Sequence, residues 1–343
     1  MVGVVAGWKG NGLRVLYVYA GAGSPVLQYE RQLAAEITSS QPDIDIDFWD
    51  WTGDMRLPAN PTFAWAKANT DTLRPFYKRL KQRASNADVT LISQTGGILP
   101  DEMSELPGTV VYNTADDPDS SDTCSFPFLK AADVIAHAGV NFDAGRTIAE
   151  VFIERGAKRC VHFPIGFYDE LFPRIEDFDA QFDKRDVELV YIGHLKRGKL
   201  EPLMRHFRKM VVHSRSLGLK HKLYIFAKTA KWVTPYRKDL GALYRRSQVG
   251  VNLHFSYGPS NARCYQLPAC GVAQVADCSE GMGQIYEKGK EVIVYSKPAE
   301  AIECIEKLLA DTRFRYNVAK DGYVRARGDY NRRDVLVRML RSL

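Results

Sequence analysis

The sequence alternates short apolar segments, rich in β-branched residues, with longer segments of helical character, and it does so twice along the chain. The first series predicts strands at 13–20, 43–49, 88–93, 109–113, 133–137 and 160–163, and the second at 186–192, 222–226, 249–253, 271–276 and 292–295. Intervening helices are expected near 26–37, 73–84, 144–155 and 202–217. Strands that alternate with helices form parallel sheets with helices on both faces. The sequence therefore predicts an α/β fold with two Rossmann-like, doubly wound domains.

The length of 343 residues suits two domains of about 150 residues each. The break falls in the proline-bounded segment 164–173 and the irregular, charged segment that follows it. We expect an N-terminal domain at 1–170 and a C-terminal domain at 171–325. The Arg-rich segment 326–343 is expected to be helical and to cross back to the first domain.

Composition is that of an ordinary globular protein. Hydrophobic residues make up 45% of the chain and charged residues 26%. The sequence has neither a run of eighteen apolar residues nor an N-terminal apolar segment, so we expect neither a membrane span nor a secretory signal. We therefore expect a cytoplasmic location. The six scattered cysteines form no metal-binding spacing and are expected to be thiols. A net charge of +6 weakly favours an anionic partner.

Two loops in the second half have residues that suit a diphosphate. Gly193 ends a predicted strand, and the cations Lys196, Arg197 and Lys199 follow within six residues. Glycine permits close approach of backbone N–H groups to an anion, and charge-assisted hydrogen bonds to phosphate are strong. A solvated basic turn is the alternative.

The second loop leads into a short predicted helix. Asn261 and Arg263 lie at its N-terminus, where the helix dipole attracts anions. Gln266 is one helical turn further and shares a face with Arg263, so it could bond ribose hydroxyls. An ordinary helix cap is the alternative.

The segment Tyr244–Tyr295 contains RSQVGVNLHFSYGPSNARCYQLPACGVAQVADCSEGMGQIYEKGKEVIVY. It resembles the donor-binding signature of CgeB-like glycosyltransferases, a branch of the GT-B superfamily. The loop YIGHLKRGK and the Phe163-Pro164-Ile165 linker are similar, more distantly, to those of T-even phage DNA β-glucosyltransferases. The resemblance covers most of 109–295.

This resemblance implies a glycosyltransferase of GT-B fold, with two domains facing a central cleft and a nucleotide-sugar, most simply a UDP-sugar, on the second domain. Arg197 and Arg263 would contact the diphosphate, supported by Lys196 and Lys199, with no metal or other cofactor. Gln266 replaces the ribose-binding Glu of the family, which leaves the donor open. The acceptor would be hydroxymethylated bases of duplex DNA in a phage genome; a polysaccharide, a protein, a small molecule, or a degenerate binding protein without activity are the alternatives.

Asp116 and Asp117 directly follow a predicted strand and precede Pro118. The resemblance implies that one of them is the general base of an inverting transfer, with Asp116 preferred. Capping of the turn is the alternative, and Asp117-Pro118-Asp119 also has the spacing of a metal-binding DxD motif.

Other residues at predicted strand ends are candidates for acceptor or cleft contacts. His137 could orient the acceptor or act as an alternative base, although a buried, hydrogen-bonded imidazole is the simpler interpretation. The remaining candidates lie in two glycine-containing loops, which could equally serve only to reverse the chain: Gly21, Gly23, Ser24, Gln94 and Gly96.

Overall fold

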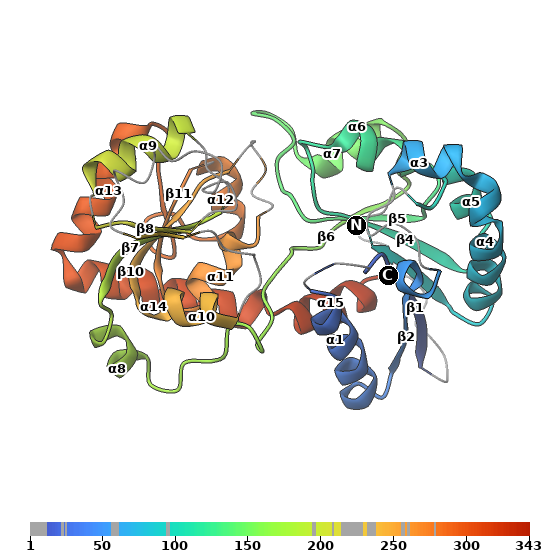
Figure 1. Ribbon diagram of the computed structural model, residues 1–343, viewed down its shortest axis with the longest axis horizontal. Helices are drawn as coiled ribbons and strands as arrows, with labels where there is room; N and C mark the ends of the chain where they lie inside the picture. Colours follow the sequence, from blue (N-terminus) through green and yellow to red (C-terminus); the bar gives the residue numbers. More distant parts are fainter. Residues whose placement is uncertain are drawn as a thin grey trace, which may run out of the picture. The chain divides into compact units, whose positions relative to one another are not determined.

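The computed structural model divides into two compact units (Figure 1). Unit 1 comprises Met1–Pro164 and Val335–Leu343, and unit 2 comprises Ile165–Asp334. The structure describes residues 12–21, 24, 26–55, 62–93, 97–193, 197–207, 209–213, 229–231, 238–254, 258, 261–277 and 279–343. Within these described residues, each unit contains one parallel sheet of six strands. The alternating pattern predicted a parallel sheet in each half, with six strands in the first and five in the second.

The division differs in detail from the predicted one. The expected boundary after residue 170 lies inside unit 2, which begins at Ile165. Only the last nine residues of the final segment, Val335–Leu343, belong to unit 1, whereas residues 326–334 belong to unit 2.

The sheet of unit 1 has the strand order β2-β1-β3-β4-β5-β6. Its strands are β1 (Leu13–Tyr19), β2 (Ile44–Asp50), β3 (Val89–Ser93), β4 (Thr109–Thr114), β5 (Val134–His137) and β6 (Cys160–His162). The predicted strands of the first series are confirmed to within two residues. The order changes direction between β1 and β3, the point in such a sheet where the loops diverge.

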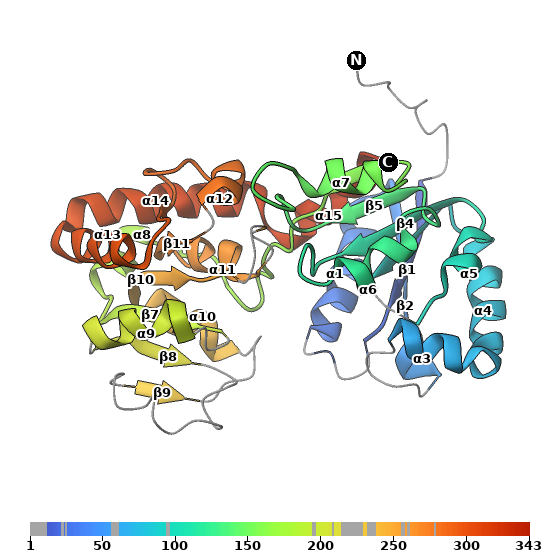
Figure 2. The same cartoon turned by 90° about the horizontal axis from the view of Figure 1, so that it is seen from above.

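Both faces of this sheet are covered, as its continuous apolar strands require. On β1, Leu13, Val15 and Tyr17 face a core that includes the last helix, and Leu16 and Val18 face the opposite core. The helices are α1 (Leu27–Ser40), α2 (Trp51–Asp54), α3 (Phe63–Ala68), α4 (Thr70–Ala84), α5 (Pro100–Ser104), α6 (Ser121–Cys124), α7 (Ile148–Glu154) and α15 (Arg332–Arg341), with a 3₁₀ turn at Phe126–Phe128. Figure 2 shows α4 and α5 together on one side of this sheet.

The sheet of unit 2 has the order β12-β11-β10-β7-β8-β9. Its strands are β7 (Val187–Ile192), β8 (Val211–His213), β9 (Thr229–Lys231), β10 (Ser247–Asn252), β11 (Ala273–Ala276) and β12 (Ile293–Val294). Counted within the unit, this is the strand order of a dinucleotide-binding Rossmann sheet, with its switch point between β7 and β10.

Helices cover both faces of this sheet as well. They are α8 (Phe178–Asp183), α9 (Arg197–His206), α10 (Lys238–Arg245), α11 (Arg263–Ala269), α12 (Ser279–Ile285), α13 (Pro298–Ala310) and α14 (Thr312–Asp329). Figure 1 shows α9 on one side of the sheet and α10 and α11 on the other. No helix in the described ranges is long and apolar enough to cross a membrane.

One predicted element of unit 2 is wrong. Instead of a helix over 202–217, α9 ends at His206 and β8 begins at Val211. The β-branched Val211 and Val212 favour an extended backbone, and Val212 is fully buried in the core of the unit. The predicted strand 222–226 lies outside the described residues.

Candidate functional site

The switch point of unit 2 holds a fixed positive charge. Arg263 begins α11, and its Nη1 donates to the carbonyl oxygen of Ile192 (2.9 Å), at the end of β7. Its Nη2 donates to the carbonyl of Leu253 (2.8 Å), just past the end of β10. Its Nε donates to Oδ1 of Asn252 (3.1 Å). The guanidinium therefore bridges the two strands whose ends form the usual ligand site of such a sheet.

Among the described residues, these bonds use three of the five guanidinium N–H groups, and the other two have no acceptor there. The charge lies over the face of Tyr191, 5.3 Å from the ring centroid. Because backbone oxygens and an aromatic ring hold the guanidinium, and no carboxylate is among these partners, its charge is not neutralised by them. An anion at this strand end would meet a preorganised donor.

Gly193 adjoins this guanidinium. A Cβ at residue 193 would lie 2.4 Å from Nη1 of Arg263 and 3.0 Å from the hydroxyl of Tyr191. The absent side chain is thus what lets the guanidinium lie against the end of β7. Gly193 and Arg263, from the two loops singled out in the sequence, therefore lie side by side; their contact with a diphosphate stays a prediction.

Lys199, on the first turns of α9, lies at the same strand ends. Its Nζ donates to the carbonyl of His254 (2.8 Å) and forms an ion pair with Oδ2 of Asp277 (2.5 Å). Its charge is therefore shared with a carboxylate, which the sequence did not predict. Lys196 lies outside the described residues, as does the side chain of Arg197.

A buried carboxylate organises this strand end. Asp277 follows β11, and its Oδ1 accepts hydrogen bonds from the backbone N–H (2.8 Å) and Nδ1 (2.7 Å) of His254. Burial opposes ionisation of Asp277, but its hydrogen bonds from His254 and its hydrogen bond and ion pair with Lys199 outweigh burial and place its pKa below the ordinary value. Asp277 is therefore ionised at neutral pH.

Cys264 adds a neutral group to this network. Its Sγ lies 3.2 Å from both Nε2 of His254 and Nδ2 of Asn252. Burial raises the pKa of the thiol to about 12, so it stays protonated. It adds no negative charge next to Arg263.

Sequence reasoning did not single out His254, Asp277 or Asn252. The available signal was their position: His254 and Asp277 directly follow predicted strands and Asn252 is next to the end of one, where ligand-site residues collect in parallel sheets. Their mutual contacts were not predictable because 23 residues separate His254 from Asp277.

Two further predicted donor contacts lie on or beside α11. Gln266 is buried on the helix, and Asn261 is half-buried just before it. Nδ2 of Asn261 is buried and has no hydrogen-bond partner among the described residues. Their roles toward a ribose or a phosphate remain predictions.

In unit 1, the structure separates the two catalytic candidates. Asp116 is exposed just beyond β4. Asp117 is 1% exposed, and its Oδ1 accepts hydrogen bonds from the hydroxyls of Ser121 and Ser125, both at 2.6 Å. Asp117 thus stabilises the turn, the alternative that its position before Pro118 left open, and only Asp116 is presented to solvent.

His137 is buried at the end of β5. Its Nδ1 bonds to the carbonyl of Gly139 (2.8 Å), and its ring packs edge-on to Phe152. Burial lowers its pKa, so the imidazole is neutral at pH 7. This matches the simpler interpretation of a buried, hydrogen-bonded histidine.

The glycine loop after β1 has an internal structural role. The N–H of Gly21 donates to Oδ1 of Asp50 (3.0 Å), and a Cβ at residue 21 would lie 2.4 Å from Leu27. Oγ of Ser24 lies 3.3 Å from the hydroxyl of Tyr19. Gly23, Gln94 and Gly96 lie outside the described residues.

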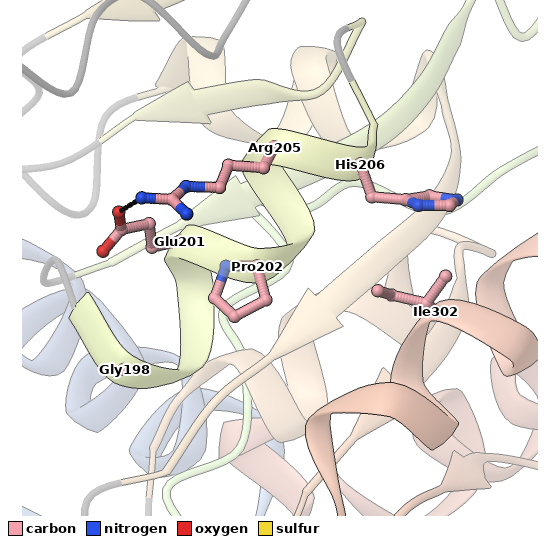
Figure 3. A pocket seen from close by; sticks show the side chains of 6 residues that line it. All are labelled: Gly198, Glu201, Pro202, Arg205, His206 and Ile302. Carbon is pink, nitrogen blue, oxygen red and sulfur yellow. Dashed lines mark hydrogen bonds and ion pairs between the residues drawn. The ribbon is translucent and has the colours of Figure 1, made fainter.

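A separate hollow of about 520 Å³ lies between α9 and α13 (Figure 3). It is lined by Gly198, Glu201, Pro202, Arg205, His206 and Ile302. Glu201 and Arg205 form an ion pair on its rim, and His206 pairs with Glu306 (2.7 Å). The hollow is lined by none of the residues described at the switch point of unit 2, so it is not part of that site: Arg263, Lys199, Asp277, His254, Asn252 and Cys264.

Comparison with known proteins agrees with this architecture. Residues 200–341 match the model of a family described as glycosyl transferase-like. No curated protein matches the chain by sequence.

Several solved structures share the fold over nearly the whole chain. Sucrose-phosphate synthase from Thermosynechococcus elongatus is 14% identical, with a TM-score of 0.64 over 95% of this chain and 97% of its own. Anabaena HepE in complex with UDP-glucose is 14% identical, with a TM-score of 0.62 over 96% and 100%. An alpha-glucosyltransferase in complex with UDP and a 13-mer DNA containing an HMU base is 13% identical, with a TM-score of 0.58 over 96% and 98%. The fold is therefore that of the GT-B glycosyltransferases.

Proposed function

We propose that this chain, which has the fold of the GT-B glycosyltransferases and a glycosyl transferase-like segment at residues 200–341, transfers a sugar from a UDP-sugar to an acceptor hydroxyl. The observation that carries the proposal is Arg263, whose guanidinium bridges the ends of β7 and β10 and has two N–H groups that bond to none of the described residues and could bind an anion. The donor diphosphate is the anion that fits this place, because a Rossmann-like sheet binds its ligand at the switch point.

Fixed cations at this point would stabilise the charge that develops on the departing diphosphate. Preorganised donors act strongly because they need no reorganisation during the reaction. Arg263 supplies such a charge and Lys199 a second one, partly shared with Asp277. We therefore propose transfer without a metal ion.

For the acceptor side we propose Asp116 as the general base of an inverting transfer. Its exposure supports the assignment, since a base must reach the acceptor hydroxyl within hydrogen-bond distance. Asp117, bonded to two serines, would hold the turn that carries Asp116.

For the acceptor we propose a hydroxymethylated base in duplex DNA. The net charge of +6 favours a polyanion, and one protein of the same fold is an alpha-glucosyltransferase in complex with an HMU-containing DNA. Transfer to a polysaccharide, a protein or a small molecule, and binding without transfer, are the competing outcomes of the test below.

The test measures UDP release by the full chain from a panel of UDP-sugars. Matched duplexes carry hydroxymethyluracil, hydroxymethylcytosine or no modification, and oligosaccharides are tested in parallel. We expect release that depends on a hydroxymethylated duplex and falls as salt rises. Release that depends only on an oligosaccharide would reject the DNA acceptor.

A thermal shift with each donor separates binding from catalysis, because a ligand at one hundred times its Kd stabilises a protein by about 2.7 kcal/mol. A shift without UDP release under any acceptor condition would indicate a degenerate binding protein. Neither a shift nor release with any donor would reject the proposed function.

A further inference from the structure

An unbroken chain of contacts joins the two cations at the switch point of unit 2. Lys199 bonds to Asp277, and Asp277 bonds to His254. His254 in turn lies 3.4 Å from Nδ2 of Asn252, whose Oδ1 accepts from Nε of Arg263. The proposed function gives diphosphate contacts only to Lys199 and Arg263. It gives no such contact to the buried residues that connect them, Asp277, His254 and Asn252.

His254 occupies the centre and is almost fully buried, with 2% of its side chain exposed. Asp277 accepts from its Nδ1, which fixes the proton on that nitrogen and leaves Nε2 as an acceptor. Nε2 faces the Cys264 thiol and the Asn252 amide, which both can donate. Every polar atom of this imidazole thus has a fitting partner.

The arrangement also fixes both cations to neighbouring peptide groups. Arg263 donates to the carbonyl of Leu253 and Lys199 to the carbonyl of His254. A shift of His254 would therefore move the acceptors of both cations together, through its backbone and through its side chain. The charges involved are Lys199, Arg263 and the carboxylate of Asp277, while Cys264 stays neutral.

We propose that His254 is a positioning residue that couples Lys199 to Arg263, so that the two cations bind the donor diphosphate as one unit. This inference rests on the proposed donor site. It predicts that the two cations contribute non-additively to diphosphate binding, and that the non-additivity depends on the imidazole.

The test is a double-mutant cycle on the full chain, with UDP binding measured by calorimetry. The cycle uses Lys199→Gln, Arg263→Gln and the double variant, first with His254 present and then with His254→Leu. Each variant weakens UDP binding by some factor. We expect the factor for the double variant to be at least about fivefold smaller than the product of the factors for the two single variants, as is usual for residues of one network. With His254→Leu the losses should multiply to within about twofold.

His206→Leu is the matched control, because His206 also pairs with a carboxylate on unit 2 but is exposed. It should leave the coupling unchanged. If His254→Leu does not fold, Cys264→Ser and Cys264→Ala replace it: serine keeps a donor for Nε2 and should retain the coupling, whereas alanine should reduce it.

Additive losses with His254 present would overturn the coupling while leaving the donor site intact. If the coupling between Lys199 and Arg263 were the same in His254→Leu as with His254 present, the role of His254 would be overturned. Where the Cys264 variants replace His254→Leu, unchanged coupling in both of them would have the same consequence. If the unmodified chain bound no UDP, the proposed UDP-sugar donor and this inference would both fall.

Discussion

Arg263 and Lys199 donate to the carbonyl oxygens of two consecutive residues, Leu253 and His254. The cations come from two different helices, α11, which follows β10, and α9, which follows β7. Two positive charges fixed to one peptide segment form a compact anion site, because neither side chain must be reorganised when a ligand arrives.

Replacement of Arg263 by lysine should therefore be costly although the charge is kept. Lysine has no planar fork and cannot make the three bonds to Ile192, Leu253 and Asn252. We expect kcat/KM for the donor to fall about 100-fold, or about 2.7 kcal/mol. Steady-state kinetics with UDP release as the readout measures this. Arg313→Lys, on the exposed surface of α14, is the control, and equal activity of the two variants would contradict the assignment.

Gly193→Ala should weaken donor binding without unfolding the protein. The new Cβ would lie 2.4 Å from Nη1 of Arg263 and force the guanidinium away from Ile192. We expect about tenfold weaker UDP binding by calorimetry, the effect of one lost charge-assisted hydrogen bond.

Gly198→Ala is the matched control, since a Cβ there meets no atom within 4 Å. Alanine within α9 should leave affinity unchanged and raise the stability by about 0.5–1 kcal/mol. Unchanged UDP affinity in Gly193→Ala would mean that Arg263 does not bind the diphosphate from the position seen here.

Much of this site followed from local sequence pattern. Gly193 and Arg263 were identifiable because a parallel sheet collects its ligand residues at strand ends, and each of them lies in a loop or helix start after an apolar strand. The two sheets followed for the same reason, since continuous β-branched segments separated by helices leave little choice of topology.

What pattern could not provide was the direction of individual side chains. Two adjacent carboxylates, Asp116 and Asp117, look equivalent in sequence, and only the folded turn directs one to the serines and the other to solvent. The Lys199–Asp277 ion pair joins residues 78 positions apart, so no local signal marks it. The sequence analysis included the short strand β8 in a predicted helix, because three residues are too few to show the alternation of apolar and polar side chains that marks a strand.

The two neighbouring aspartates should give opposite phenotypes. Asp116→Asn removes the proposed base and should lower kcat about 100-fold with little change in Tm, a typical contribution of general base catalysis. Asp117→Asn replaces a buried acceptor of two hydroxyl bonds and should lower the stability by about 1–3 kcal/mol. UDP release and thermal unfolding on both variants give the comparison. The two roles would be reversed if the Asp117→Asn variant lost most of its kcat at unchanged stability while the Asp116→Asn variant remained active.

The stability of the chain should decrease as the pH falls below about 6.5, in part because of His137. Burial lowers the pKa of this imidazole in the folded state, so the unfolded chain takes up the proton first. Its contribution is therefore complete above pH 6.5 and is lost as the pH falls toward the lower folded value. One proton gives a slope of at most about 1.4 kcal/mol per pH unit.

Urea unfolding of the unmodified chain and of His137→Asn, between pH 7.5 and 5.5, isolates this contribution. Asparagine keeps an N–H that can bond to the carbonyl of Gly139 but does not titrate, so the slope should be smaller in the variant. His206→Asn, at an exposed histidine paired with Glu306, serves as the control for removal of any histidine. Equal slopes in His137→Asn and the unmodified chain would show that His137 titrates alike in the folded and unfolded states, contrary to its burial beside Phe152.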